Sequence, residues 1–281
     1  MTFILGTFLL ALVTALACAL PGVFIVPRRS SMIVDGISHA VFPGIVVGYL
    51  FTHDLRSPWL ILGAALAGLL VVLGAEWFAA TGLVAGDAPQ GLVFPALFAV
   101  GIILVTARLS HIHLDTHTVL VGDLNLASFD RLTFGGLDLG PSYLYVMLAI
   151  LALNAAFLAA VFPRLTAATF DPVHARLLGI PVRWLGLAFM FTVSLTVTAA
   201  FHAAGALLVI ALLVTPAATA QLLATRLAPF LAWTLLFALL GAGAGFWIAF
   251  ATDTATSAAM ATVYGAMFLT VLLGTRRHRL R

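Results

Sequence analysis

Apolar residues fill most of this 281-residue chain and are interrupted only by short polar stretches. A helix that crosses a membrane needs about 20 consecutive apolar residues to span roughly 30 Å of hydrocarbon. Runs near that length predict eight or nine spanning helices, since two of the runs are separated by almost nothing. The runs cover residues 3–26, 31–52, 57–81, 91–109, 141–162, 184–200, 203–224, 228–250 and 255–274.

The composition places the chain in the same class. Hydrophobic residues make up 63% of it and charged residues 8%, whereas a soluble domain carries about 25% charged residues. We therefore expect an all-α, polytopic integral membrane protein, with a single transmembrane domain over residues 1–281 and no soluble domain. This composition excludes the soluble enzymes as a class.

All 13 basic residues are Arg, and Lys is absent. The nucleotide-binding motif Gly-x-x-x-x-Gly-Lys-Ser/Thr needs a Lys, so this chain does not hydrolyse nucleotide by that route. Energy for any transport must come from a partner or a gradient. The excess of Arg lies at the membrane edges, which fits membrane orientation and not nucleic-acid binding.

The Arg residues also predict which side of the membrane each helix end faces. With segment 163–183 in the cytoplasm, ten Arg fall inside and three outside, which agrees with the positive-inside rule. The three outside are Arg56, Arg108 and Arg131. In the version with nine helices, the N-terminus faces out and the C-terminus faces in.

Segment 32–44, MIVDGISHAVFPG, places an acid and an imidazole inside the second run. Asp35 and His39 are four residues apart and so share one face of a helix. A charge at this depth costs about 2.5–3.5 kcal/mol, so such a pair marks a functional site. At about 1.5 Å per residue from Arg29, His39 lies roughly 15 Å deep, near the midplane.

A carboxylate and an imidazole one turn apart are ligands suited to Mn²⁺, Fe²⁺ or Zn²⁺. We therefore expect Asp35 and His39 to contribute to an ion path. Pro43 and Gly44, one turn further along, predict a break in the helix that frees backbone carbonyls for an ion. The alternative is that Asp35 caps the helix at the cytoplasmic edge and His39 hydrogen-bonds a neighbouring helix.

Segment 163–183 contains FDPVHARLLGIP, which predicts a short helix. Asp171 suits the N-cap, Pro172 the first helical position and Gly179 the left-handed residue after the last turn. A short capped helix on a cytoplasmic loop fits docking to a soluble partner. It equally fits an amphipathic turn that lies on the headgroups, with Arg176 as its anchor.

Polar residues on the outer side offer further candidate metal ligands. His111, His113, Asp115 and His117 alternate along the chain, so all four lie on one side of an extended segment. They either bind metal ions at the outer entrance of the path or belong to a solvated loop that binds no metal. His202, at the outer start of a later run, is either an extracytoplasmic gate ligand or an interfacial His that reaches water.

Four stretches of the chain carry a resemblance to a known family. In order, VDGISHAVFPG, GDAPQGLVFPALFAVG, FDPVHARLLGI and GALLVIALLVTPAATA are similar to the successive signatures of the manganese, zinc and iron permeases of ATP-binding-cassette importers. They run from Asp35 to Ala220 and so cover most of the chain.

This resemblance implies a multi-pass permease of the bacterial plasma (inner) membrane that carries Mn, Zn or Fe ions as substrate and holds no permanent cofactor. It implies three protein partners: a separate ATP-binding-cassette ATPase subunit, an extracytoplasmic metal-binding protein and a second permease chain, as a homodimer. Asp35 and His39 would line the ion path. The capped helix would couple the permease to the ATPase through Asp171, His174, Arg176 and Gly179.

A different class of transporter is also compatible with these residues. In a gradient-driven secondary transporter or channel, Asp35 and His39 would relay protons, and no ATPase would be needed.

Overall fold

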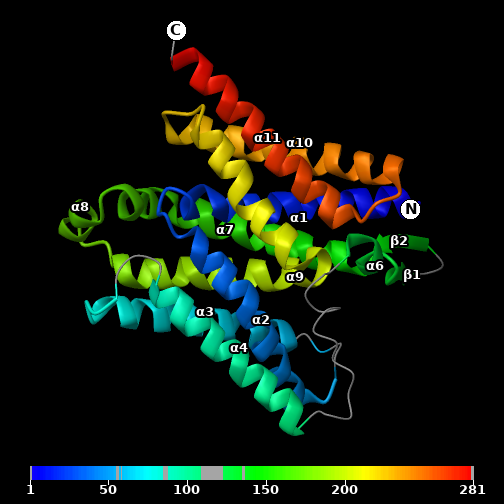
Figure 1. Cartoon of the computed structure of the whole chain (residues 1–281), viewed down its shortest axis with the longest axis horizontal. Helices are drawn as coiled ribbons and strands as arrows, with labels where there is room; N and C mark the ends of the chain where they lie inside the picture. The colour runs from blue at the N-terminus through cyan, green and yellow to red at the C-terminus, as the bar shows by residue number, and fades with distance from the viewer. Residues whose placement is uncertain are drawn as a thin grey trace.

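The computed structural model describes residues 2–54, 57, 59–84, 88–108, 123–134 and 137–279. It confirms the all-α, polytopic prediction, because eight helices in these ranges are long and apolar enough to cross a membrane (Figure 1). They are α1 (Phe3–Ile25), α2 (Ser31–Thr52), α3 (Trp59–Ala80), α4 (Ala88–Arg108), α7 (Ser142–Phe170), α9 (Val182–Gln221), α10 (Leu227–Thr252) and α11 (Thr256–Arg279).

Four short elements lie between the long helices: α6 (Leu124–Ala127), β1 (Arg131–Phe134), β2 (Leu137–Pro141) and α8 (Pro172–Leu177). The antiparallel β1–β2 hairpin was not expected from the sequence. Arg131 and Asp138 pair across it, with 2.6 Å between Nη2 and Oδ2. A hydrogen bond from the Gly140 N–H, together with the Arg131 guanidinium, holds the pKa of Asp138 below its usual value. The hairpin and α8 lie at opposite ends of the molecule (Figure 1).

The α9 helix reverses direction at Gly205. Gly205 has φ 78° and ψ 164°, which divides α9 into a first leg, 182–204, and a second leg, 206–221. Tyr143, at the start of α7 beside the hairpin, donates a hydrogen bond of 2.7 Å to the Ala199 carbonyl, so the bend lies at the hairpin end. In Figure 1 the second leg, in yellow, runs back from that end.

Contacts at the other end of the molecule confirm the reversal. Phe189, near the start of α9, lies under the Arg28 guanidinium in the turn between α1 and α2. Gln221, the last residue of α9, lines a pocket with Pro27 of that turn and Phe170 of α7. Both ends of α9 therefore face the same side of the molecule. The two predicted runs 184–200 and 203–224 are the two legs.

The arginines agree with this topology. Arg28, Arg176, Arg183 and Arg226 all lie at the α8 end, and Arg131 lies on the hairpin at the other. The positive-inside rule therefore makes the α8 end cytoplasmic. α7 continues through Pro163 as far as Phe170, so the connection to α9 is shorter than the expected loop 163–183.

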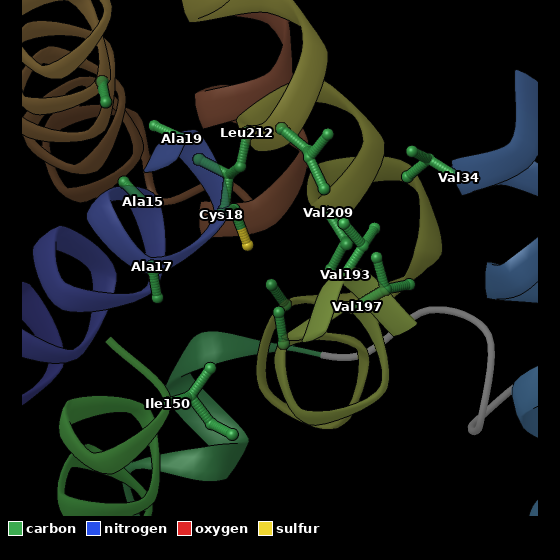
Figure 2. Close-up of a cluster of buried hydrophobic side chains, with 14 of the residues drawn as sticks. Ala15, Ala17, Cys18, Ala19, Val34, Ile150, Val193, Val197, Val209 and Leu212 are labelled. Carbon is green, nitrogen blue, oxygen red and sulfur yellow. The ribbon is translucent and has the colours of Figure 1, made fainter. Parts of the chain in front are cut away.

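The main core forms around α1. Cys18 of α1 lies on the side of α9, close to Leu212 of its second leg, and Val193 of the first leg and Ile150 of α7 belong to the same buried cluster (Figure 2). Because both legs pack against α1, the bend in α9 wraps one helix and buries most of its length.

Two buried polar side chains tie the helices together inside this core. The Asn154 amide of α7 donates to the Ala17 carbonyl of α1 at 3.0 Å and to the Thr196 hydroxyl of α9 at 2.7 Å. The Ser194 hydroxyl of α9 donates to the Ala65 carbonyl of α3 at 2.8 Å. In hydrocarbon these donors have no water as an alternative hydrogen-bond partner, so each bond fixes the relative position of the helices that it joins.

A second group of helices, α2, α3 and α4, packs beside this core. The break that Pro43 and Gly44 predict is not found, because α2 is helical from Ser31 to Thr52. Gly44 serves a different purpose: a Cβ there would lie 2.4 Å from the Ala64 Cα atom, so only glycine allows α2 and α3 to approach this closely.

We expect Gly205→Ala to destabilise the protein. The φ and ψ of Gly205 fall in a region that is essentially restricted to glycine, where a side chain costs about 1–3 kcal/mol. The melting temperature of the purified protein should fall by roughly 3–10 °C. Gly243→Ala is the matched control, since a Cβ at Gly243 of α10 would meet no atom within 4 Å. Equal melting temperatures for the two variants would contradict the role given to Gly205.

Candidate metal path

Asp35 and His39 face each other on α2. The His39 Nε2 atom lies 3.6 Å from the Asp35 Oδ1 atom. Asp35 is in the second turn of α2, whose N-cap is Ser30, so the alternative in which Asp35 caps this helix is ruled out. About a third of each side chain is exposed, 36% for His39 and 33% for Asp35. The pair therefore lies on an accessible surface and does not enclose an ion on all sides.

The spacing of the two atoms fits a shared metal ion as ligands. With bonds of about 2.1 Å to each atom, an ion between them would have a ligand–metal–ligand angle of roughly 118°, near the tetrahedral angle of about 109°. In the described part of the chain, no group of three His, Cys, Asp or Glu side chains converges on a common point. Among side chains of these four types in the described residues, the pair thus offers two ligands without a third.

Two aromatic rings of α4 hold the His39 imidazole. Phe94 stacks on it with 5.3 Å between ring centroids and 15° between planes. Phe98 meets it edge-on at 6.1 Å and 80°. Sequence reasoning missed both residues. Their spacing of four residues marks one face of α4, but it does not reveal that this face packs against His39.

Gln90 of α4 was also missed. It lies one helical turn before Phe94 and therefore on the same side of the helix. Its Oε1 atom is buried and has no hydrogen-bond partner among the residues that the structure describes. An amide carbonyl oxygen of this kind is a hard ligand. Gln90 lies closer to the cytoplasmic end of α4 than the contact between Phe94 and His39.

Of the other predicted ligands, only His202 lies within the described residues. The His202 ring is exposed and lies 4.9 Å from the ring of Tyr143, on the α7 side of the bend in α9. His111, His113, Asp115 and His117 lie outside the described residues.

The predicted short helix in the connection between α7 and α9 is present as α8. The Asp171 carboxylate accepts a hydrogen bond of 2.9 Å from the His174 N–H and so caps it. At the other end, Gly179 has φ 75°, and the Ile180 N–H donates to the Ala175 carbonyl at 3.0 Å. These are the N-cap and the left-handed C-terminal residue expected from the sequence.

The surface of α8 mixes charged and apolar side chains. Asp171, His174 and Arg176 are exposed. Val173 and Leu177 are also exposed, at 65% and 81%, although they are apolar. An exposed apolar surface at the cytoplasmic end suits either a protein partner or the membrane surface.

These features together define a class of protein. A chain that crosses the membrane repeatedly, carries an acid–imidazole pair inside one helix and presents a capped helix at its cytoplasmic end is built as a transport permease. The chain belongs to the ABC 3 transport family, which matches residues 1–275. It is a multi-pass protein of the bacterial inner membrane.

Two relatives share most of its length. It is 42% identical over 270 residues to the zinc transport system membrane protein TroD of Treponema pallidum (strain Nichols), covering 96% of this chain and 73% of that one. It is 35% identical over 257 residues to the manganese transport system membrane protein MntD of Bacillus subtilis (strain 168), covering 92% and 87%.

A solved structure shares the fold. PsaBC from Streptococcus pneumoniae, in complex with Fab, superposes with a TM-score of 0.78 at 24% identity and covers 96% of this chain and 91% of that chain. At this identity the likeness shows that the two chains share a fold.

We expect Phe94→Leu to weaken the interaction of an ion with His39. Leu keeps the apolar volume but removes the stacked ring, which is worth about 0.5–1.5 kcal/mol, so the KM for metal uptake should rise roughly 2- to 10-fold. Leu97→Ala, a neighbouring change on α4, controls for general loosening of that helix. A KM that rises no more for Phe94→Leu than for this control would show that the ring does not position His39.

Proposed function

We propose that the chain is the membrane permease of an ATP-driven importer for a divalent transition-metal ion, Mn²⁺, Zn²⁺ or Fe²⁺. The observation that carries this proposal is the Asp35–His39 pair, 3.6 Å apart in a membrane helix of an ABC 3 family protein. The names of its relatives, which transport zinc and manganese, support the choice of substrate.

The permease is not itself an enzyme, and ATP hydrolysis belongs to a separate subunit. The absence of Lys from the sequence is consistent with this division, because the chain cannot form the phosphate-binding loop. An extracytoplasmic metal-binding protein delivers the ion to the outer end, where α6 and the β1–β2 hairpin lie. Alternating access then carries the ion past Asp35 and His39 to the cytoplasm.

Two protein ligands suit transit better than storage. An ion must bind strongly enough to enter and weakly enough to leave, so a path needs several weak sites and not one closed cage. His39 and Asp35 leave the remaining coordination positions of an ion open. Gln90, with its buried Oε1 atom, is a candidate for the next oxygen ligand towards the cytoplasm.

A second permease chain completes the path. Asp35 and His39 are each about one-third exposed on the surface of a single chain, where lipid would otherwise meet a carboxylate. A charge in that environment costs about 2.5–3.5 kcal/mol, which favours cover by another protein surface. We infer a homodimer with the ion path between its chains.

Native mass spectrometry of the active complex counts its permease chains. We expect two, and a single permease chain would contradict the homodimer.

The cytoplasmic contact with the ATPase is assigned to α8. Its capped ends fix a short rigid helix, and its exposed residues combine two charges with the apolar side chains of Val173 and Leu177. Asp171, His174, Arg176 and Gly179 set the shape and charge of this surface. A rigid helix that fits a groove on the ATPase transmits movement in both directions.

We expect Asp35→Asn combined with His39→Gln to abolish ATP-dependent metal uptake in proteoliposomes that contain the permease and its ATPase and are supplied with the extracytoplasmic metal-binding protein. The two changes keep size and polarity but remove the carboxylate and the imidazole. Assembly with the ATPase should be retained. His53→Gln is the control, since His53 is an exposed imidazole at the far end of the same helix.

Uptake by the double variant at the wild-type rate would refute the assigned path. Vesicles that contain the wild-type permease but no ATPase test the class of transporter. If the wild-type chain alone, without any ATPase, moved metal in response to a pH gradient, a secondary transporter would replace the importer.

We expect charge reversal on α8, Asp171→Lys with Arg176→Glu, to uncouple ATP hydrolysis from transport. Both side chains are exposed, so the packed helices should tolerate the change, and the loss of the Asp171 cap is confined to α8. The ratio of ions transported to ATP hydrolysed should fall about 10-fold, as for loss of a contact worth roughly 1.4 kcal/mol. Arg164→Glu, an exposed charge reversal on α7, is the control. An unchanged ratio would return α8 to the role of a membrane anchor.

A further inference from the structure

Arg28 occupies an unusual position in the turn between α1 and α2. Its Nε–H donates a hydrogen bond of 2.9 Å to the Thr169 hydroxyl, near the end of α7. Its guanidinium carbon lies 5.0 Å from the centre of the Phe189 ring, in the first leg of α9. One side chain thus joins the α1–α2 turn, α7 and α9.

The charge of Arg28 is held without an acidic partner. Among the described residues, no carboxylate forms an ion pair with it, since the ion pairs there are Asp35–His39 and Arg131–Asp138. Burial lowers the pKa of Arg28 to about 10, which still leaves it protonated at neutral pH. Among the described residues, the side-chain contacts of this partly buried cation are a hydroxyl and an aromatic face, which compensate its burial only in part.

On one side, Arg28 is linked to the start of α8. Thr169 is two residues before Asp171, the residue that caps α8. The Thr169 hydroxyl also donates to the Leu165 carbonyl at 2.7 Å, which fixes the direction of the lone pair that Arg28 uses. Movement of α8 therefore displaces the acceptor of this hydrogen bond directly.

On the other side, Arg28 is linked to the start of α2. The Arg28 carbonyl accepts a hydrogen bond of 3.3 Å from the hydroxyl of Ser30, which is the N-cap of α2. The Ser30 N–H in turn bonds to the Ile25 carbonyl at the end of α1. Asp35 follows within the next helical turn and a half, so the turn and the ion ligands move as one rigid body.

We propose that Arg28 is a positioning residue that transmits movement of α8 to α2 and so to the ligands Asp35 and His39. This inference rests on the proposed function, in which α8 contacts an ATPase. The link is short: from the α8 cap through Thr169 and Arg28 to the N-cap of α2. The planar guanidinium suits this role, because it holds its hydrogen bond and its ring contact in one fixed geometry.

The test compares Arg28→Met with Arg29→Met in proteoliposomes that contain the permease and its ATPase, with the extracytoplasmic metal-binding protein present to deliver the ion. The probe is Mn²⁺ or Zn²⁺, whichever the wild-type protein transports, and the readout is the number of ions taken up per ATP hydrolysed. Arg29 is the matched control, because it is the adjacent, exposed Arg with the same charge and the same effect on membrane orientation. We expect the ratio to fall about 5- to 10-fold for Arg28→Met and to stay unchanged for Arg29→Met.

A second variant acts on the other end of the same hydrogen bond. Thr169→Val removes the hydroxyl at nearly constant volume and should lower the ratio about 2- to 5-fold. The double variant should be no worse than Arg28→Met alone, since both changes remove one link. Arg28→Lys keeps the charge but not the planar fork, so it should recover only part of the coupling.

The proposal is overturned if Arg28→Met and Arg29→Met give the same ratio, or if Arg28→Met lowers uptake and hydrolysis in equal proportion. If Arg28→Met does not assemble, a wild-type ratio for Thr169→Val overturns it instead. A failure of the proposed function is distinguishable, because the wild-type vesicles would then show no ATP-dependent uptake at all.

Discussion

Every polar group inside a membrane must find its partner within the protein, because hydrocarbon offers none. The Asn154 amide meets this demand by joining α7 to α1 and α9, and the Ser194 hydroxyl meets it by joining α9 to α3. Asp35 and His39 do not meet it fully, since they face one another at 3.6 Å and remain about one-third exposed. The same constraint therefore separates the polar groups that hold the helices together from the pair that is available to an ion.

The reversal of α9 determines how these two sets of groups are arranged. Its legs enclose α1, and its first leg also reaches α3 through Ser194. The α2–α3–α4 group is therefore attached to the main core at one side, and within this group α4 packs against His39 of the ion pair. Such an arrangement keeps the core rigid while leaving α2 accessible to movement that enters through the α1–α2 turn.

Local chemistry was predictable from the sequence, and long-range packing was not. The apolar runs located every spanning segment, and the caps Asp171 and Gly179 located α8, because both signals depend only on neighbouring residues. The break was predicted in the wrong helix: Pro43 is accommodated within α2, whereas α9 bends at Gly205. The Phe94 stack on His39 joins two helices, so no local pattern announces it. The β1–β2 hairpin did have a signal that was overlooked, the Gly-Gly pair between the apolar segments RLTF and LDLG.

The position of α4 has a practical consequence. This helix supplies the rings that orient His39, yet nearly all of its residues remain at least partly exposed within a single chain. Its other sides depend on whatever surrounds the protein. Extraction into detergent replaces those neighbours with a mobile shell, so α4 should loosen before the helices around α1. A solubilised sample can then retain its helical content while the alignment of His39 is lost. Metal-binding measurements made in lipid nanodiscs will therefore report on the site more faithfully than those made in micelles.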